Sequence, residues 1–172
     1  QLAVLDKYST LIPRAAETVN ILRSEFGLKI GSTTGFTKAM VDVLLKNAKA
    51  QGYVPDASVA GDEVLNGERP KPFMVYQNLE LLNVHPIQSV VKVDDTVGGV
   101  GEGLEAGCWT VGLSRYSNYM DIDSFEHESE ISAEEMEYRH NISKDILRKS
   151  GAHYVVDTIA NMPEVVTDIN KR

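Results

Sequence analysis

Short apolar runs alternate along this chain with longer stretches in which apolar residues recur every three or four positions. The short runs are typical of strands buried in a parallel sheet, and the three-to-four spacing is typical of amphipathic helices. Strands are predicted at 28–32, 57–60, 89–93, 108–113 and 153–156. Helices are predicted at 13–27, 38–51, 72–82 and 162–171, with a glycine-rich turn and short helix at 95–106 and another helix that ends near 150.

This strand–helix unit occurs about five times, which predicts an α/β fold with a doubly wound parallel sheet. The length of 172 residues suits one domain, 1–172, whose core is large enough to fold without disulfides or structural metals. The acidic stretch 121–137 departs from the pattern and predicts an exposed loop that enters a helix. Within it, Ser132 and Glu135 have the spacing of a capping box.

Composition narrows the class of protein. A hydrophobic fraction of 42% with 24% charged residues is ordinary for a globular domain and argues against disorder. No apolar run of about 18 residues is present, so no membrane partner is expected. The net charge of −8 argues against a nucleic-acid coat. The single cysteine, Cys108, cannot form an internal disulfide, which agrees with a cytoplasmic location.

Small hydroxyl residues and a glycine follow the first predicted strand, at the sheet edge where ligands of such folds bind. Ser32, Thr33, Thr34 and Gly35 lead from that strand into a helix, so their O–H and N–H groups could bind an anion. The alternative is an ordinary strand–helix turn in which serine and threonine act as caps.

Charged residues follow the second and third predicted strands. Arg69 lies in a loop stiffened by prolines, and its guanidinium suits bidentate binding of phosphate; the alternative is a solvated basic turn. Asp94 and Asp95 supply hard oxygen ligands of the kind that Mg²⁺ prefers; the alternative is an aspartate that caps the next helix.

The three candidate groups follow three successive strands, which favours one shared site over three unrelated structural roles. Hydroxyl groups, a guanidinium and carboxylates with a metal would meet at one edge of the sheet. Phosphoryl transfer needs this set, because its catalysis consists mainly of positioning and of charge neutralisation.

The same strings resemble motifs II, III and IV of the haloacid dehalogenase superfamily, and more closely those of its phosphonoacetaldehyde hydrolase (phosphonatase) family. The stretches that carry the resemblance are KIGSTTGFT at 29–37, QGYVPD at 51–56, GERP at 67–70, KVDD at 92–95, EAGCWTVGL at 105–113 and GAHYVVD at 151–157. They extend over nearly the whole chain. The stretches around Thr34, Arg69 and Trp109 are much more specific than the superfamily motifs alone.

The resemblance implies hydrolysis of the carbon–phosphorus bond of phosphonoacetaldehyde, a small phosphonate, to acetaldehyde and phosphate with Mg²⁺. In that family a cap-domain lysine forms a Schiff base with the aldehyde, and an aspartate on the first strand takes the phosphoryl group. By position, Thr34 with its neighbours would hold the phosphoryl oxygens and Arg69 would balance their charge. Asp95 would hold Mg²⁺, and Asp94 would help directly or through water.

The sequence departs from the family pattern in two ways. The family often has an acidic residue four positions after Asp95, and Gly99 stands there, so that carboxylate is either absent or supplied by Asp94. The first-strand motif with its nucleophile and the cap with its lysine have no matching string, so we expect an N-terminally truncated core domain. Such a chain alone would be inactive and marginally stable. The cap-mediated homodimer of the family would be lost.

Other functions remain as alternatives. Another haloacid dehalogenase-like phosphatase or phosphomutase would share this core, and its cap residues would distinguish it. A non-catalytic fragment that binds phosphate or a partner would lack an upstream nucleophile. A receiver-like signalling domain fits less well, because it carries its acidic pair near the first strand and its phospho-acceptor after a middle strand.

Overall fold

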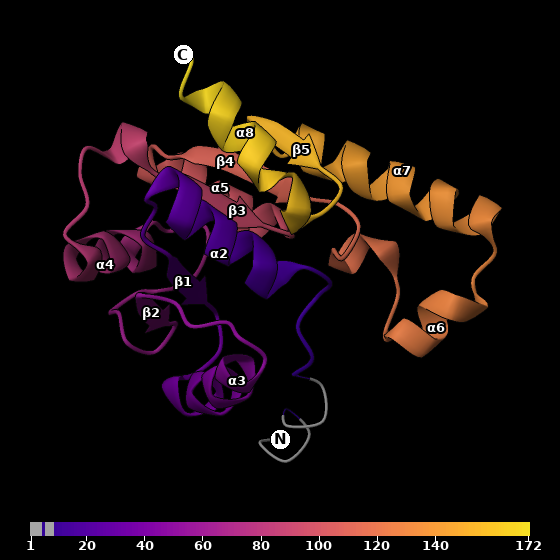
Figure 1. The fold of residues 1–172 in the computed structure, drawn as a ribbon, viewed down its shortest axis with the longest axis horizontal. Coiled ribbons are helices and arrows are strands. Elements are labelled where there is room, and N and C mark those ends of the chain that lie inside the picture. The colour runs from indigo at the N-terminus through magenta and orange to yellow at the C-terminus, as the bar shows by residue number, and fades with distance from the viewer. Residues whose placement is uncertain (1–4, 6–8) are drawn as a thin grey trace.

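The computed structural model describes residue 5 and residues 9–172. Five strands alternate with helices throughout this part of the chain (Figure 1). The elements are α2 (Ala15–Phe26), β1 (Gly31–Thr34), α3 (Lys38–Ala50), β2 (Ala57–Ala60), α4 (Phe73–Leu82), β3 (Val91–Asp94), α5 (Val97–Ala106), β4 (Trp109–Leu113), α6 (Phe125–Glu130), α7 (Ala133–Lys149), β5 (Tyr154–Val156) and α8 (Met162–Ile169).

Every strand pair in the described part of the chain is parallel, which confirms the predicted α/β class. β1 pairs with β2, and β4 lies between β3 and β5. Among the described residues β1 and β3 do not pair with each other, so the strands form two sheets instead of one continuous sheet. The break between the two sheets lies between the strands that end at Thr34 and at Asp94.

Two strands begin two or three residues later than the apolar pattern predicted. β1 covers Gly31–Thr34 instead of 28–32, and β3 covers Val91–Asp94 instead of 89–93. The apolar side chains of Leu28 and Ile30 nevertheless pack against the core that α2 and α8 form. An apolar run marks the residues whose side chains are buried. These residues extend beyond those whose backbones form the hydrogen bonds of the sheet, so the predicted and observed strand boundaries differ.

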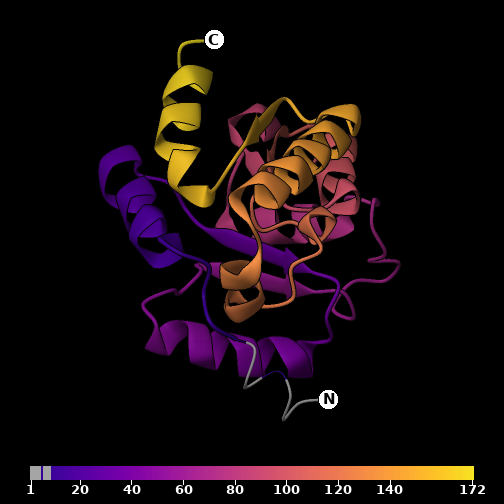
Figure 2. The ribbon, with the colours of Figure 1, turned by 90° about the vertical axis from the view of Figure 1, so that its right-hand side faces the viewer.

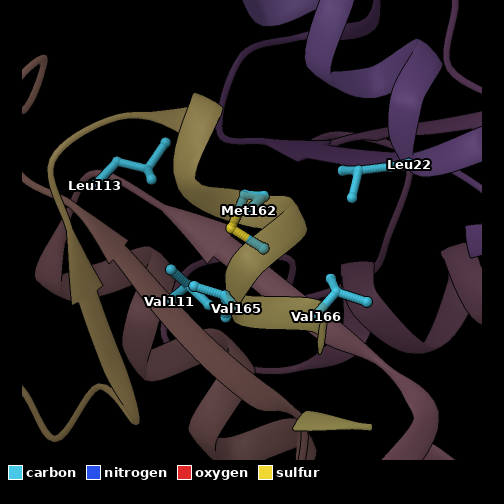
Figure 3. Close-up of a cluster of buried hydrophobic side chains, with 6 residues drawn as sticks. All are labelled: Leu22, Val111, Leu113, Met162, Val165 and Val166. Carbon is cyan, nitrogen blue, oxygen red and sulfur yellow. The ribbon is translucent and has the colours of Figure 1, made fainter. Parts of the chain in front are cut away.

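The main core lies between the β3–β4–β5 sheet and helices α2 and α8, which stand side by side on one face of that sheet (Figures 1 and 2). Figure 3 shows its six buried residues, which come from α2, β4 and α8. They are Leu22, Val111, Leu113, Met162, Val165 and Val166. Helices α5 and α7 contact strands of the same sheet, and α4 contacts both β1 and β2.

A second, smaller cluster joins α4 to α5 and contains Val75, Ala106 and Cys108. Cys108 thus packs as a small apolar residue, and burial raises the pKa of its thiol to about 11. Because α4 contacts β1 and α5 contacts β3, the α4–α5 pair connects the two sheets beside the candidate site residues.

The acidic stretch is more ordered than the sequence predicted. Helix α6 lies within it, where a loop was expected, because the Ser124 side chain accepts a hydrogen bond from the His127 amide and caps the helix. Ser132 caps α7 as predicted, its Oγ accepting from the Glu135 amide at 3.2 Å. No described helix combines the length and the apolar character that a membrane span requires.

Candidate active site

The predicted hydroxyl residues lie in β1 itself and not in the turn after it. Ser32, Thr33 and Thr34 are strand residues, and Gly35 follows the end of the strand. The prediction of a turn made of hydroxyl residues was therefore wrong. Their backbone groups take part in the β1–β2 pairing, from Ser32 opposite Ser58 to Thr34 opposite Ala60.

Only one of the three hydroxyl groups contacts a charged residue. The Ser32 Oγ donates to the Ser58 Oγ at 2.8 Å, on the neighbouring strand β2. The Thr34 Oγ1 accepts from the Phe36 amide at 3.2 Å, which is the local capping role of the alternative interpretation. The Thr33 Oγ1 instead donates to Glu102 Oε2 at 3.1 Å and so faces α5.

Arg69 is held by three groups of the protein, which excludes the solvated basic turn. Its Nη2 donates to both the carbonyl oxygen and the Oγ1 of Thr33 at 3.1 Å. Its Nη1 lies 3.4 Å from Asp94 Oδ2, and its Nε lies 3.1 Å from Glu102 Oε2. Only 22% of the side chain is exposed. The guanidinium therefore connects the end of β1 with β3 and α5.

Lys92 completes a network of opposite charges. Its Nζ lies 2.6 Å from Asp94 Oδ2 and 3.4 Å from Glu102 Oε2. Two cations and two carboxylates thus alternate around one buried centre, and we call Thr33, Arg69, Lys92, Asp94 and Glu102 the Glu102 cluster. The formal charge of the Glu102 cluster is zero, because the charges of Arg69 and Lys92 balance those of the two carboxylates inside the protein.

Asp94 does not cap α5. The N-cap is Thr96, whose Oγ1 accepts from the Gly99 amide at 3.0 Å. Asp94 Oδ1 accepts in turn from the amide and the hydroxyl of Thr96, at 3.0 and 2.8 Å. The carboxylate is thereby fixed between the Thr96 cap on one side and the cations Lys92 and Arg69 on the other.

The two adjacent carboxyls have opposite pKa shifts. Burial acts to raise the pKa of Asp94, but the charges of Lys92 and Arg69 and the hydrogen bonds from Lys92 and Thr96 outweigh it and lower that pKa. Burial raises the pKa of Asp95, and the negative charge of Asp94 raises it further. A cation at Asp95 would offset both effects, because it stabilises the ionised form.

Gly99 leaves room for the Asp94 carboxylate. A Cβ at position 99 would overlap all three terminal atoms of the Asp94 side chain, so no side chain fits there while Asp94 keeps this orientation. The acidic residue that the family often has at this position could not coexist with it. The structure therefore favours the alternative in which Asp94 supplies the carboxylate.

The residues present fit a divalent cation through Asp95. Among the described side chains, no group of three or more His, Cys, Asp or Glu residues is arranged to hold a metal. Asp94 is already engaged by Lys92, Arg69 and Thr96, whereas none of the ion pairs in the described part of the chain involves Asp95. Asp95 is thus the carboxylate with the capacity for a hard cation.

Sequence reasoning missed two members of the cluster, Glu102 and Lys92. Glu102 stands between two glycines in a helix of small residues, where an acidic side chain that is not at a helix end is unusual. Lys92 stands two residues before Asp94 on one strand, so alternation places both side chains on one face of the sheet. Those two signals could have identified them.

The chain is similar to curated proteins along almost its whole length. No protein-family model matches it. It is 42% identical over 170 residues to the phosphonoacetaldehyde hydrolase of Bacillus cytotoxicus. That alignment covers 99% of this chain and 63% of the relative, so the chain spans less than two thirds of the relative's length.

Solved structures agree with this family. A phosphonoacetaldehyde hydrolase-like protein from Oleispira antarctica has 36% identity and a TM-score of 0.94, covering 99% of this chain and 61% of that chain. A conserved haloacid dehalogenase-like protein from Agrobacterium tumefaciens has 19% identity and a TM-score of 0.67, covering 92% and 61%, which supports the fold alone. Over the part of their length that it spans, this chain is similar in sequence to phosphonoacetaldehyde hydrolases, and it has the fold of haloacid dehalogenase-like proteins.

Proposed function

We propose that the protein containing this chain hydrolyses the carbon–phosphorus bond of phosphonoacetaldehyde to acetaldehyde and phosphate. The 42% identity to a phosphonoacetaldehyde hydrolase over 170 residues carries the proposal. The site is consistent with it, because Arg69 and Asp94, far apart in the sequence, meet at the carboxyl ends of parallel strands. Products of this reaction would include a phosphate dianion, for which a guanidinium is a suitable ligand.

In this proposal Arg69 binds the phosphoryl oxygens and balances the charge that develops on them. The β1 residues Ser32, Thr33 and Thr34, with Gly35, form the adjoining wall, with Thr34 nearest the end of the strand. The Thr34 hydroxyl accepts from the Phe36 amide, so its own proton is free to be donated to a phosphoryl oxygen. Asp94 keeps the Arg69 and Lys92 side chains beside the site through its ion pairs.

Asp95 is the proposed ligand for Mg²⁺, with Asp94 contributing directly or through water. When bound, Mg²⁺ would supply charge neutralisation at the phosphoryl group. The raised pKa of Asp95 favours this assignment, since burial and the charge of Asp94 both penalise an ionised Asp95 that has no cation.

The proposed reaction also requires a nucleophilic aspartate and a Schiff-base lysine, for which the 172 residues hold no matching string. The experiment therefore uses the complete protein that the gene encodes. As part of the same proposal, that protein acts in the cytoplasm as a homodimer.

The test is to incubate that protein with phosphonoacetaldehyde and Mg²⁺ and to quantify acetaldehyde and inorganic phosphate separately. Equal amounts of both products, and inactivation by borohydride only when the aldehyde is present, would support the proposal. Hydrolysis of phosphate monoesters with no cleavage of phosphonoacetaldehyde would instead identify another haloacid dehalogenase-like phosphatase. An absence of both activities would favour a non-catalytic phosphate-binding protein.

A further inference from the structure

Glu102 presents a problem for a site that binds an anion. Its side chain is fully buried, at 0% exposure, and its Oε2 lies 3.1 Å from the Arg69 Nε. A buried negative charge so close to a phosphoryl site opposes the binding of another negative charge. Burial of the carboxylate is also costly by itself. Glu102 should therefore have a role that offsets its repulsion of a bound anion and the cost of its burial.

We propose that Glu102 is a positioning residue that orients the Arg69 guanidinium for a phosphoryl group. The inference rests on the proposed phosphate-binding role of Arg69 and extends it to a residue outside the superfamily motifs that the sequence displays. Glu102 would favour anion binding despite its charge, because a guanidinium held in one orientation loses less conformational freedom when the ligand binds.

The contacts of Arg69 define that orientation. Thr33 accepts two hydrogen bonds from Nη2, and Glu102 lies beside Nε, so two different sides of the planar group are held. Thr33 is itself tied to Glu102 by the 3.1 Å hydrogen bond from its Oγ1. Arg69, Thr33 and Glu102 thus form a closed triangle, in which Glu102 fixes both the cation and the residue that accepts from it.

Helix α5 is shaped to bring Glu102 to this place. A Cβ at Gly101 would lie 3.0 Å from the Cβ of Pro70, and one at Gly98 would lie 3.8 Å from the Cβ of Arg69. The glycine surface of α5 thus lets the helix lie directly against the Arg69–Pro70 loop. This close approach places the carboxylate against the cation.

The pairing rests on charge and proximity. Neither Arg69 Nε nor Glu102 Oε1 has a hydrogen-bond partner in the described part of the chain. Lys92 Nζ, 3.4 Å from Glu102 Oε2, contributes a second positive charge to the same carboxylate. Neutralising Glu102 would therefore release Arg69 from one of its restraints without removing a hydrogen bond from Nε.

The test is the sign of the change in affinity for inorganic phosphate. In Glu102→Gln, which keeps the side-chain shape, simple charge repulsion predicts tighter binding, whereas positioning predicts weaker binding. Titration calorimetry with phosphate in the presence of Mg²⁺, on the complete gene product, distinguishes them. We expect affinity to fall about tenfold, the size expected for loss of one charge-assisted contact. Glu105→Gln, the same charge change at an exposed position of α5, is the matched control.

A second background shows whether the effect passes through Arg69. In Arg69→Met, the Glu102→Gln change should no longer weaken phosphate binding, because the group that Glu102 orients is absent. Equal weakening in both backgrounds would indicate a general structural role and would overturn the inference. Unchanged or tighter binding of phosphate by Glu102→Gln alone would also overturn it.

An NMR measurement keeps this result separate from the proposed function. The ¹H–¹⁵N resonance of the Arg69 Nε should shift and broaden in Glu102→Gln but not in Glu105→Gln, with no phosphate added. If the unsubstituted protein binds no phosphate, the proposed function fails, and this resonance alone decides whether Glu102 orients Arg69. An unchanged resonance would refute the positioning role even if the enzyme is active.

Discussion

Arg69 Nη1 lies 3.4 Å from Asp94 Oδ2, so the candidate phosphate ligand and the carboxylate pair of the candidate metal site are already in contact. The two residues stand 25 positions apart in the chain; Asp94 ends β3, and Arg69 lies in the loop between β2 and α4. Any change in the charge of one therefore alters the surroundings of the other.

Replacing Arg69 with alanine should lower turnover of phosphonoacetaldehyde by about 10³-fold, the lower range for loss of an arginine that neutralises a transferring phosphoryl group. Lys71→Ala removes an exposed cation from the same loop and should leave turnover within a few fold, which makes it the control. The measurement is steady-state release of phosphate by the complete protein. Retained turnover in Arg69→Ala would remove this residue from the site.

Replacing Asp95 with asparagine should weaken Mg²⁺ binding at least about tenfold, because the amide keeps the shape but loses the charge. The Mg²⁺ concentration needed for half-maximal activity would rise accordingly. Asp123→Asn, in the acidic stretch outside the site, is the control. If the Mg²⁺ dependence of Asp95→Asn matched that of the unsubstituted protein, another residue would have to be the ligand.

Replacing Gly99 with alanine should destabilise the protein by about 1–3 kcal/mol, the usual cost of overpacking, because the new methyl group overlaps the Asp94 carboxylate. Gly98→Ala is the matched control: its methyl group makes only a 3.8 Å contact with the Arg69 Cβ. Because alanine favours a helix more than glycine does, Gly98→Ala should leave the stability unchanged or raise it by about 1 kcal/mol. Chemical denaturation of the two variants compares them, and equal unfolding free energies would contradict the predicted overlap.

The unfolding free energy should fall as the pH drops below about 6.5, partly because of His140. Burial lowers the pKa of this histidine and the charge of Lys144 lowers it further, while Asp157 opposes them. The unfolded chain therefore takes up a proton at a higher pH than the folded chain. The stabilisation is complete above the unfolded pKa and is lost as the pH falls from there toward the folded value.

The variant His140→Gln isolates this contribution, since glutamine can still bond to the Ser114 Oγ, which lies 2.8 Å from the His140 Nε2. Urea unfolding of both proteins between pH 5 and 8 should show a shallower decline for His140→Gln in the acidic range. Parallel curves would show that His140 titrates alike in the folded and unfolded states.

Except for α6, the helices and the order of the strands could be predicted from the sequence, because both depend on local spacing. Pro13 before α2, Gly27 after it and the Ser132 cap of α7 are signals within a few residues of the element that they mark. The division into two sheets could not be predicted from such spacing, since pairing depends on which strands become neighbours.

The members of the site were only partly predictable. Arg69, Asp94 and Asp95 lie at or after the ends of predicted strands and carry residue types with recognised chemistry, so the sequence could single them out as candidates. Glu102 contacts Thr33 across 69 positions and Arg69 across 33. The two glycines beside Glu102 mark it as unusual, but no local pattern indicates which distant residues it contacts, and a carboxylate in the middle of a helix usually faces solvent.

Helix α5 has four glycines among its ten residues, at 98, 99, 101 and 103. Each glycine disfavours a helix by about 1 kcal/mol relative to alanine, so this segment has little tendency to become helical by itself. Its helical conformation must therefore be stabilised by packing against β3, β4 and α4, which it contacts. The Glu102 cluster should consequently assemble late in folding, after the strands have paired, and the peptide 95–107 alone should be a random coil in water.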